Sequence, residues 1–208
     1  MEKHNGKTWK ENRLKNMDPI NIIAGLNLIA TFGANATGAK KGLKSTVTVA
    51  KEKPDTYLQK LPLALSTIIL LLFILALFKI GTFSYKDQYQ TLRLIGLVVY
   101  LVFSWGQIWA FKSLGTSYSQ EVLIHRNHKL IEKGPFKLIR HPQYLSQILM
   151  DLGAGLATLS FLIIPLSLIE IPILIIRALL EEKLLEKNFK EKFLEYKSRS
   201  GFMLPFIG

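Results

Sequence analysis

Long blocks of apolar residues alternate with basic segments in this chain of 208 residues. The clearest block, 61–80, contains 20 residues and a single charge. A helix rises about 1.5 Å per residue, so a block of this length crosses a hydrocarbon layer of ~30 Å. Charges gathered between apolar blocks, and not on one face of each helix, are typical of polytopic membrane proteins. The sequence therefore predicts an all-α, multi-pass integral membrane protein.

About five transmembrane helices are expected. Three come from residues 19–38, 61–80 and about 91–111; the first block contains three asparagines and three glycines, so it either spans against neighbouring helices or lies at the interface. The segment 144–180 would be about 55 Å long as a single helix, too long for a bilayer. We therefore expect a helical hairpin that reverses near 158–160.

The distribution of lysine and arginine predicts the orientation. The linker 39–60, the insertion 112–143 and the residues after 176 carry six, six and seven of them, against five in residues 1–17 and one in 81–90. The positive-inside rule therefore places the insertion in the cytoplasm, and an active site there would face the cytoplasm. We divide the chain into an N-terminal region, 1–111, and a core, 112–208.

The net charge of +12 is explained by cytoplasmic loops and anionic headgroups, and no soluble basic domain remains that would bind nucleic acid. The absence of cysteine excludes disulfides and Cys-ligated metals. His125 and His128 lie close together, but without an HExxH-type helix no metal site is predicted. The polar first 17 residues do not resemble a signal peptide.

The segment 134–144, GPFKLIRHPQY, marks the first candidate functional residues. Proline is favoured at the first position of a helix, so Pro142 predicts a helix start with Arg140 and His141 at its mouth. That helix enters the apolar region, which puts the charged pair at the membrane surface. A simple interfacial anchor, with a snorkelling arginine and Tyr144 in the aromatic belt, would give the same pattern.

A second polar cluster follows the last apolar block. Arg177 and Glu181 are four residues apart, which puts them on one helix face, and Glu182 follows. Alone, they could be a snorkelling arginine and a solvated acidic turn. The hairpin brings this cluster beside His141 and Tyr144, which indicates a site. Beyond it, we expect the last helix to continue to about residue 197 with one apolar stripe, formed by Leu185, Phe189, Phe193 and Tyr196.

Three segments together resemble the isoprenylcysteine carboxyl methyltransferase family, whose core the phospholipid N-methyltransferases share: HKLIEKGPFKLIRHPQY, RALLEE and FKEKFLEYKSRSGFMLPFI. The resemblance covers roughly residues 113–207. It implies a membrane-embedded enzyme that uses S-adenosyl-L-methionine, bound by the C-terminal part. It also implies a lipophilic or lipid-modified acceptor that reaches the enzyme from the surrounding membrane lipids.

The resemblance also assigns residues. Arg177 would face the substrate. The chemistry of methyl transfer, and not the resemblance, makes Arg177 and His141 the candidate catalytic residues. Phe136 stands where the family usually has tyrosine, and Ser200-Gly201 stand where it usually has Val-Pro. The cofactor would lie against His128, Lys129, Leu130, Ile131, Phe136, His141, Pro142, Gln143, Tyr144 and Glu181.

Two acceptor chemistries remain open, with a carboxylate preferred. A carboxylate is already nucleophilic and needs only orientation by a cation such as Arg177, whereas an amine must lose a proton, for which His141 is the first candidate. Three further functions stay as alternatives: a phospholipid or small-amine N-methyltransferase, an NADPH-dependent sterol-type reductase that uses basic residues in 126–140, and a membrane scaffold. Asp151 and Glu170 should face the bundle interior and receive no role.

Overall fold

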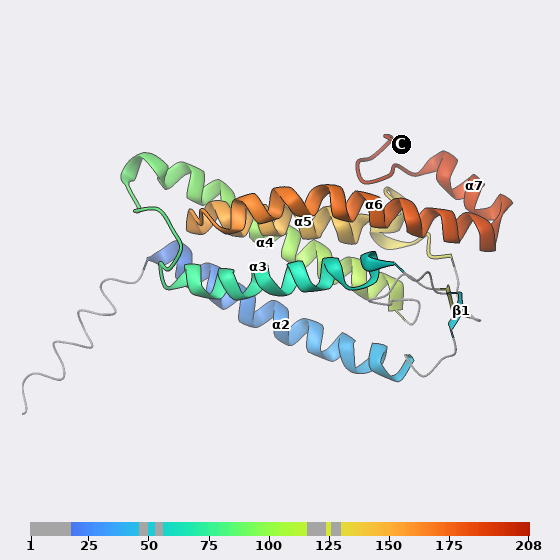
Figure 1. Ribbon diagram of the computed structural model, residues 1–208, viewed down its shortest axis with the longest axis horizontal. Coiled ribbons are helices and arrows are strands. Elements are labelled where there is room, and N and C mark those ends of the chain that lie inside the picture. Colours follow the sequence, from blue (N-terminus) through green and yellow to red (C-terminus); the bar gives the residue numbers. More distant parts are fainter. Residues whose placement is uncertain (1–17, 46–49, 53–55, 116–123, 126–129) are drawn as a thin grey trace, which may run out of the picture.

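The computed structural model describes residues 18–45, 50–52, 56–115, 124–125 and 130–208. Within these residues five long helices form a bundle in which α2 and α4 are inclined to α3, α5 and α6, and α7 with the C-terminus lies at the end opposite the α5–α6 turn (Figure 1). Short 3-10 turns η1, η2 and η4 cover Tyr57–Gln59, Asp87–Tyr89 and Gly134–Lys137, and strands β1 (Ala50–Glu52) and β2 (Ile124–His125) form one antiparallel pair. The helices are α2 (Pro19–Ser45), α3 (Leu61–Leu77), α4 (Gln90–Leu114), α5 (Pro142–Thr158), α6 (Ile163–Phe189) and α7 (Glu191–Arg199).

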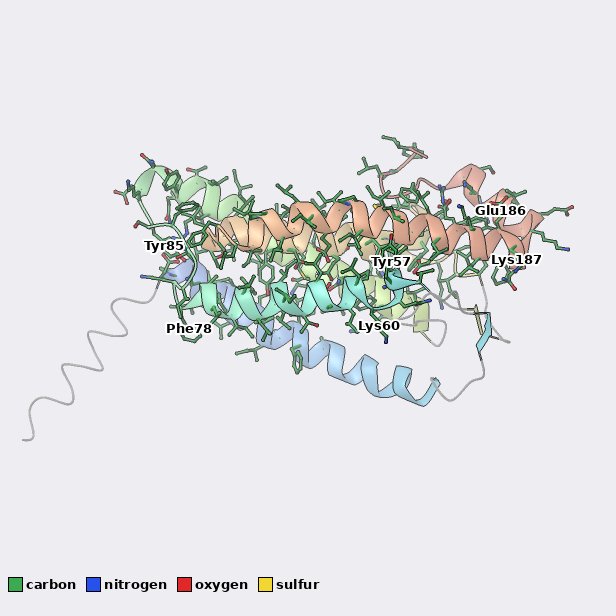
Figure 2. All side chains as sticks on the ribbon, in the orientation of Figure 1. Tyr57, Lys60, Phe78, Tyr85, Glu186 and Lys187 are labelled. Atoms are coloured by element: carbon green, nitrogen blue, oxygen red, sulfur yellow. The ribbon has the colours of Figure 1, made fainter. Side chains whose placement is uncertain are left out.

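The all-α membrane architecture is confirmed. Among the described residues, α3, α4 and α6, the first two with the turns that precede them, are long and apolar enough to cross a membrane. Their large outward side chains are exposed, as at Leu71, Ile95 and Ile169. Tyr57 and Phe78 lie at opposite ends of α3 (Figure 2). Such a surface suits lipid and not water. The apolar part of α2 and α5 are shorter, so five spans remain a prediction.

The predicted hairpin is confirmed. Helix α5 ends at Thr158, and Leu159 adopts a left-handed conformation with φ of 49°. Ser160 then accepts a hydrogen bond from the backbone N–H of Ile163 at 3.2 Å and donates one to the carbonyl of Gly81 at 3.1 Å. The side chain of Ser160 thus accepts a hydrogen bond at the start of α6 and also connects the α5–α6 turn to the segment after α3.

Two predicted boundaries are wrong. Helix α2 continues to Ser45, through residues assigned to the linker, because its alanines and lysines favour helix. Helix α6 ends at Phe189, because Lys190 has a φ of 48° that reverses the chain before α7. The apolar stripe therefore does not lie on a single helix. Only Phe193 and Tyr196, both on α7, are fully buried.

Helices α4 and α5 form the closest contact of the bundle. A Cβ atom on Gly96 would lie 2.5 Å from the backbone nitrogen of Ala157, and one on Gly153 would lie 2.6 Å from that of Tyr100. Glycine at both positions lets the backbones approach, as small residues do in membrane helix pairs. The close contact fixes the position of α5, which carries Tyr144 and Asp151.

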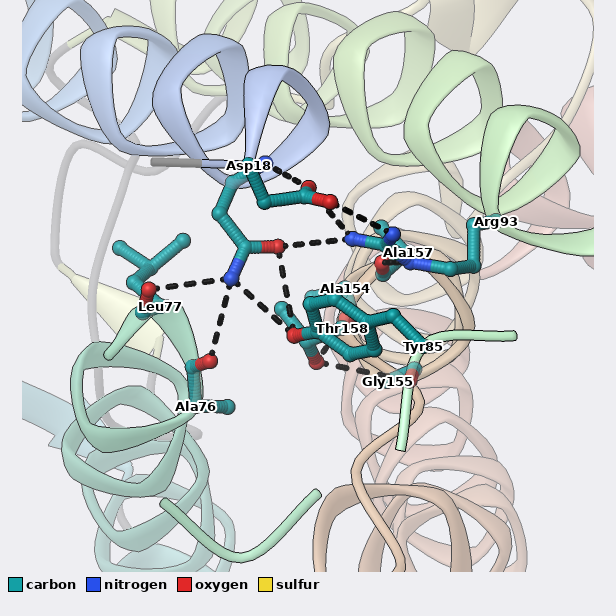
Figure 3. Close-up of polar contacts among 10 residues, drawn as sticks. Asp18, Ala76, Leu77, Tyr85, Arg93, Ala154, Gly155, Ala157 and Thr158 are labelled. Carbon is teal, nitrogen blue, oxygen red and sulfur yellow. Dashed lines mark hydrogen bonds and ion pairs between the residues drawn. The ribbon is translucent and has the colours of Figure 1, made fainter. Parts of the chain in front are cut away.

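A buried polar cluster joins four elements at the end of the bundle beside the α5–α6 turn (Figure 3). Arg93 on α4 is 1% exposed; its Nη2 lies 2.6 Å from Oδ1 of Asp18, and its Nε donates to the carbonyl of Ala157 at 2.9 Å. Asn21 accepts from Arg93 at 3.1 Å and donates to the carbonyl of Leu77 at 3.0 Å. The start of α2, the end of α3, α4 and α5 are thereby held together.

The charge of Asp18 should contribute to stability at neutral pH. Burial raises the pKa of Asp18, but the hydrogen bond and charge of Arg93 outweigh burial and leave it below 3.8. Asp18→Asn keeps the helix cap and loses the charge, so we expect a loss of roughly 1 kcal/mol, the difference between charged and neutral hydrogen bonds. Because the pKa of Asp18 is lower in the folded protein, its charge stabilises the fold above pH 3.8. This stabilisation is lost as the pH falls through the pKa that Asp18 has in the folded protein.

Thermal unfolding in detergent at neutral pH measures this loss. Asp87→Asn, at an exposed acid in η2, is the matched control and should unfold like the wild type. Equal unfolding temperatures for the two variants would show that the Asp18–Arg93 pair adds nothing to stability.

Candidate active site

The motif segment before α5 is shaped by a glycine and two prolines. Gly134 has a φ of 60°, and a Cβ there would lie 2.5 Å from the Ser113 hydroxyl oxygen. Turn η4 then buries Pro135 and Phe136, and α5 begins at Pro142, as predicted. The chain turns sharply here, and Arg140 and His141 therefore lie at the N-terminus of α5.

The C-terminal tail pairs with this segment through backbone hydrogen bonds. The N–H of Arg140 donates to the carbonyl of Gly201 at 2.8 Å, and the N–H of His141 donates to that of Phe202 at 3.0 Å. A Cβ on Gly201 would lie 1.9 Å from the carbonyl oxygen of Leu204, so this position requires glycine. The turn after Gly201 therefore depends on the glycine that replaces the family's usual proline.

Arg140 and Glu182 form a buried ion pair that supports this pairing. The Nε of Arg140 lies 2.6 Å from Oε1 of Glu182, and both side chains are 5% exposed or less. Lys197 reaches Oε2 of Glu182 at 2.9 Å. The other guanidinium nitrogens of Arg140 donate to the carbonyls of Ser200, Lys197 and Gly208. Arg140 and Glu182 thus join the segment before α5 to α6 and to the tail. Their charged groups are already engaged within the chain, so they offer few hydrogen bonds to a ligand.

Glu181, the neighbour of Glu182, points elsewhere. Consecutive helical residues project about 100° apart, and the Glu181 side chain is 21% exposed where that of Glu182 is 5% exposed. The Tyr144 hydroxyl donates to Oε1 of Glu181, and Nδ1 of His141 lies 3.8 Å from Oε2. The rings of His141 and Tyr144 stack 5.7 Å apart. A carboxylate, an imidazole and a phenol therefore meet at a partly open point.

Arg177 completes the cluster from one turn earlier on α6. Its Nε donates to the Tyr144 hydroxyl at 2.9 Å and lies 3.6 Å from Oε1 of Glu181. Its Nη1 donates to the backbone carbonyl of Leu58 in η1 at 3.1 Å, which brings the N-terminal region to the site. Sequence reasoning missed Leu58, because a backbone carbonyl leaves no signature in the residue type.

The structure thus brings Arg177, Glu181 and the start of α5 together. Phe136, in the turn η4, is buried. Its backbone carbonyl accepts a hydrogen bond from the Tyr196 hydroxyl at 2.6 Å. Burial raises the pKa of Tyr196 to about 12, so this hydroxyl stays a donor. Leu130 and Ile131 are half-buried on the approach, whereas His128 and Lys129 lie outside the described residues.

The cluster suits a zwitterionic ligand such as S-adenosyl-L-methionine. The Oε1 atom of Gln143 is buried and accepts no hydrogen bond within the described part of the chain. A buried acceptor without a donor is costly, so a donor from a ligand would satisfy it. Glu181 adds a negative charge for an amino group, and the start of α5 favours a carboxylate. The described residues contain no group of side chains that could hold a metal ion.

Comparisons with known proteins find similarity to methyltransferases. Residues 91–192 match the phospholipid methyltransferase family. Protein-S-isoprenylcysteine O-methyltransferase from Saccharomyces cerevisiae is 29% identical over 133 residues, which cover 60% of this chain and 54% of the relative. The chain therefore spans about half the length of that curated relative.

One solved structure shares the fold. It is the eukaryotic intramembrane Ras methyltransferase, an isoprenylcysteine carboxyl methyltransferase, with a TM-score of 0.59 and 21% identity over 93% of this chain and 70% of the other. The family match spans most of α4, all of α5 and α6 and the motif segment between them, which carry every contact of the Arg177–Glu181 cluster except that of Leu58. The resemblance seen in the sequence is thereby confirmed. Through residues 91–192 the chain thus resembles the phospholipid methyltransferase family, and it is similar in sequence and in fold to isoprenylcysteine carboxyl methyltransferases.

Proposed function

We propose that this chain transfers a methyl group from S-adenosyl-L-methionine to a lipophilic or lipid-modified acceptor at the membrane surface. The observation that carries the proposal is the convergence of His141 and Tyr144 from α5 with Arg177 and Glu181 from α6. The cofactor would supply an electrophilic methyl group on a sulfonium. The residues of the chain would then have to bind the cofactor and the acceptor, align the two, and exclude water from the site.

Three groups would hold the cofactor. Glu181 offers a half-buried carboxylate to an amino or hydroxyl donor, and Gln143 offers a buried carbonyl oxygen. The first turn of α5, from Pro142, offers backbone N–H groups to a carboxylate. The stacked rings of His141 and Tyr144 form an aromatic wall beside these groups.

The acceptor would be a carboxylate oriented by Arg177. The side chain of Arg177 is 6% exposed, and its guanidinium is held by the Tyr144 hydroxyl and by the carbonyl of Leu58, so its charge has a fixed orientation. An amine acceptor would need a base, and both ring nitrogens of His141 already lie beside carboxylates, at 3.8 Å from Glu181 and 3.3 Å from Glu182. This geometry favours the carboxylate over the amine.

The reductase alternative is less well supported. It requires basic side chains in 126–140 for the extra phosphate of NADPH. Arg140, at the end of that stretch, already donates to Glu182 and to three tail carbonyls. A membrane scaffold, the third alternative, does not explain why the Oε1 atom of Gln143 is buried without a hydrogen-bond donor among the described residues.

A methylation assay tests the proposed function. Membranes that contain the protein would be incubated with cofactor labelled on the methyl group and with a lipid extract. Base-labile label in a lipophilic product is expected, because methyl esters hydrolyse in base. Base-stable label would indicate an N-methylated product, and no label above membranes that contain Arg177→Ala would contradict the proposal.

The proposal also requires that the site faces the cytoplasm. Because the chain has no cysteine, single cysteines report their own location. In intact cells, Lys133→Cys and Lys192→Cys should resist a membrane-impermeant thiol reagent, and Lys86→Cys, on the opposite side, should react; all three positions are exposed. Labelling of Lys133→Cys or Lys192→Cys from outside would overturn the orientation.

A further inference from the structure

A cavity lies inside the bundle, away from the candidate active site. It has a volume of about 200 Å³ and is lined by α2, α3, α4 and α5. None of the residues of the Arg177–Glu181 cluster lines it. Tyr144 stands about 10 Å before Asp151 along α5, with Gln147 between them. The side-chain amides of Gln107 and Gln147, which both line the cavity, are hydrogen-bonded to each other between α4 and α5.

The inner wall of the cavity is polar and acidic. Asp151 lines it, is 5% exposed, and accepts a hydrogen bond from Gln147 at 2.6 Å. Behind Asp151, the carboxyl group of Glu170 on α6 is 0% exposed and interacts directly with that of Asp151. Ser66 donates to Oε1 of Glu170 at 3.2 Å. Two carboxyl groups can hydrogen-bond to each other only if one keeps a proton, so the pair carries at least one shared proton or one counter-cation.

One buried polar atom of this wall has no hydrogen-bond partner among the described residues. The hydroxyl of Tyr100, a residue 3% exposed, faces the cavity beside Asn27 without a hydrogen bond of standard geometry. The Asn27 amide is already engaged by Ser104 and Trp105. A buried polar atom without a partner costs free energy, and a donor placed in the cavity would remove that cost.

The outer wall is apolar and faces the lipid. Leu28 and Phe32 on α2 line it from one side, and Leu70 and Phe73 on α3 line it from the other. Phe32 is 70% exposed and Leu70 38% exposed on the outer surface. A ligand that reaches the cavity from this side must be soluble in hydrocarbon, which excludes a hydrated metal ion.

We propose that this cavity binds the ammonium group of a lipophilic amine, with Asp151 and Glu170 as its counter-charge and the apolar wall around its alkyl chain. No lysine, arginine or histidine lines the cavity among the described residues, so the acidic pair has no cation from the chain. The ammonium would take the place of the shared proton and donate to the carboxylate of Asp151 and to the hydroxyl of Tyr100. This binding does not depend on methyl transfer.

The test compares ligands of one chain length on the wild-type protein. Octylamine, 1-octanol and octanoate are titrated calorimetrically into protein in phosphatidylcholine nanodiscs, with empty nanodiscs subtracted. Because a hydrogen bond to a charged group is the stronger kind, octylamine should bind about tenfold or more tightly than 1-octanol, and octanoate should not bind. Equal affinities for the amine and the alcohol would overturn the proposal without any variant.

Variants locate the site. Asp151→Asn keeps the hydrogen bond to Gln147 and Glu170→Gln keeps that to Ser66, so at least one should remain folded. Either should weaken octylamine binding about tenfold or more. Glu186→Gln, at an exposed acid on α6, is the charge-matched control and should bind like the wild type. Unchanged affinity in a folded Asp151→Asn or Glu170→Gln would place the amine elsewhere and contradict the assignment. Methyl transfer should stay measurable when octylamine binding is lost, so this result is separate from the test of the active site.

Discussion

Arg177→Lys should lower kcat/KM for methyl transfer about 100-fold while the affinity for S-adenosylhomocysteine stays nearly the same. Nε of Arg177 donates to the Tyr144 hydroxyl and Nη1 to the carbonyl of Leu58, at 2.9 and 3.1 Å. A single ammonium group cannot keep both contacts and also present a planar fork to a carboxylate. A misplacement of about 1 Å at a reacting group can reduce the rate by this factor.

Arg199→Lys is the matched control. Arg199 lies at the end of α7, its side chain is 58% exposed, and it pairs with Glu132 outside the cluster. Its rate should equal that of the wild type. A rate for Arg177→Lys within twofold of the wild type would remove Arg177 from acceptor binding. If the rate instead rises with a pKa near 6.5 and is lost in His141→Gln, the acceptor is an amine and not a carboxylate.

Glu181→Ala should weaken the binding of S-adenosylhomocysteine about 10- to 150-fold. The change removes a charge-assisted hydrogen bond of about 1.5–3 kcal/mol from the partly exposed carboxylate. It also leaves the Tyr144 hydroxyl without its acceptor, so the ring that stacks on His141 loses one of its two anchors. Calorimetric titration of the purified protein in detergent measures the affinity.

Glu186→Ala provides the control for this change. Glu186 is an exposed acid on the same helix, 1.4 turns beyond Glu181, at the end of α6 where Figure 2 labels it with Lys187. Its affinity for S-adenosylhomocysteine should not change. A folded Glu181→Ala protein with wild-type affinity would show that Glu181 does not hold the cofactor.

Much of the architecture was predictable because the apolar blocks and the hairpin depend on length alone. The reversal near Thr158 and the helix start at Pro142 both appear in the structure where the sequence indicated them. The break at Lys190 was not predictable, because it depends on a left-handed φ at a residue type that rarely adopts one. The end of α2 was missed for a different reason: the expected span followed the apolar residues alone, whereas the alanines and lysines beyond them also favour helix.

The candidate site was predictable in part. The spacing of Arg177 and Glu181 puts them on one face, and the structure joins them to Tyr144 as expected. The different environments of Glu181 and Glu182 could not be predicted from two adjacent acids. They follow from Arg140 and Lys197, which reach Glu182 from elements distant in sequence. Nothing in the sequence showed that the carbonyl of Leu58 would hold Arg177.

Equilibrium dialysis of the detergent-purified wild-type protein with labelled S-adenosyl-L-methionine tests the central claim most directly. One cofactor should bind per chain, unlabelled S-adenosylhomocysteine should displace it, and excess NADPH should not. The cluster around Glu181 should account for the binding, so the label should be largely lost in Glu181→Ala and retained in Glu186→Ala. Displacement by NADPH, or the absence of bound label in folded wild-type protein, would contradict the assignment of this site to S-adenosyl-L-methionine.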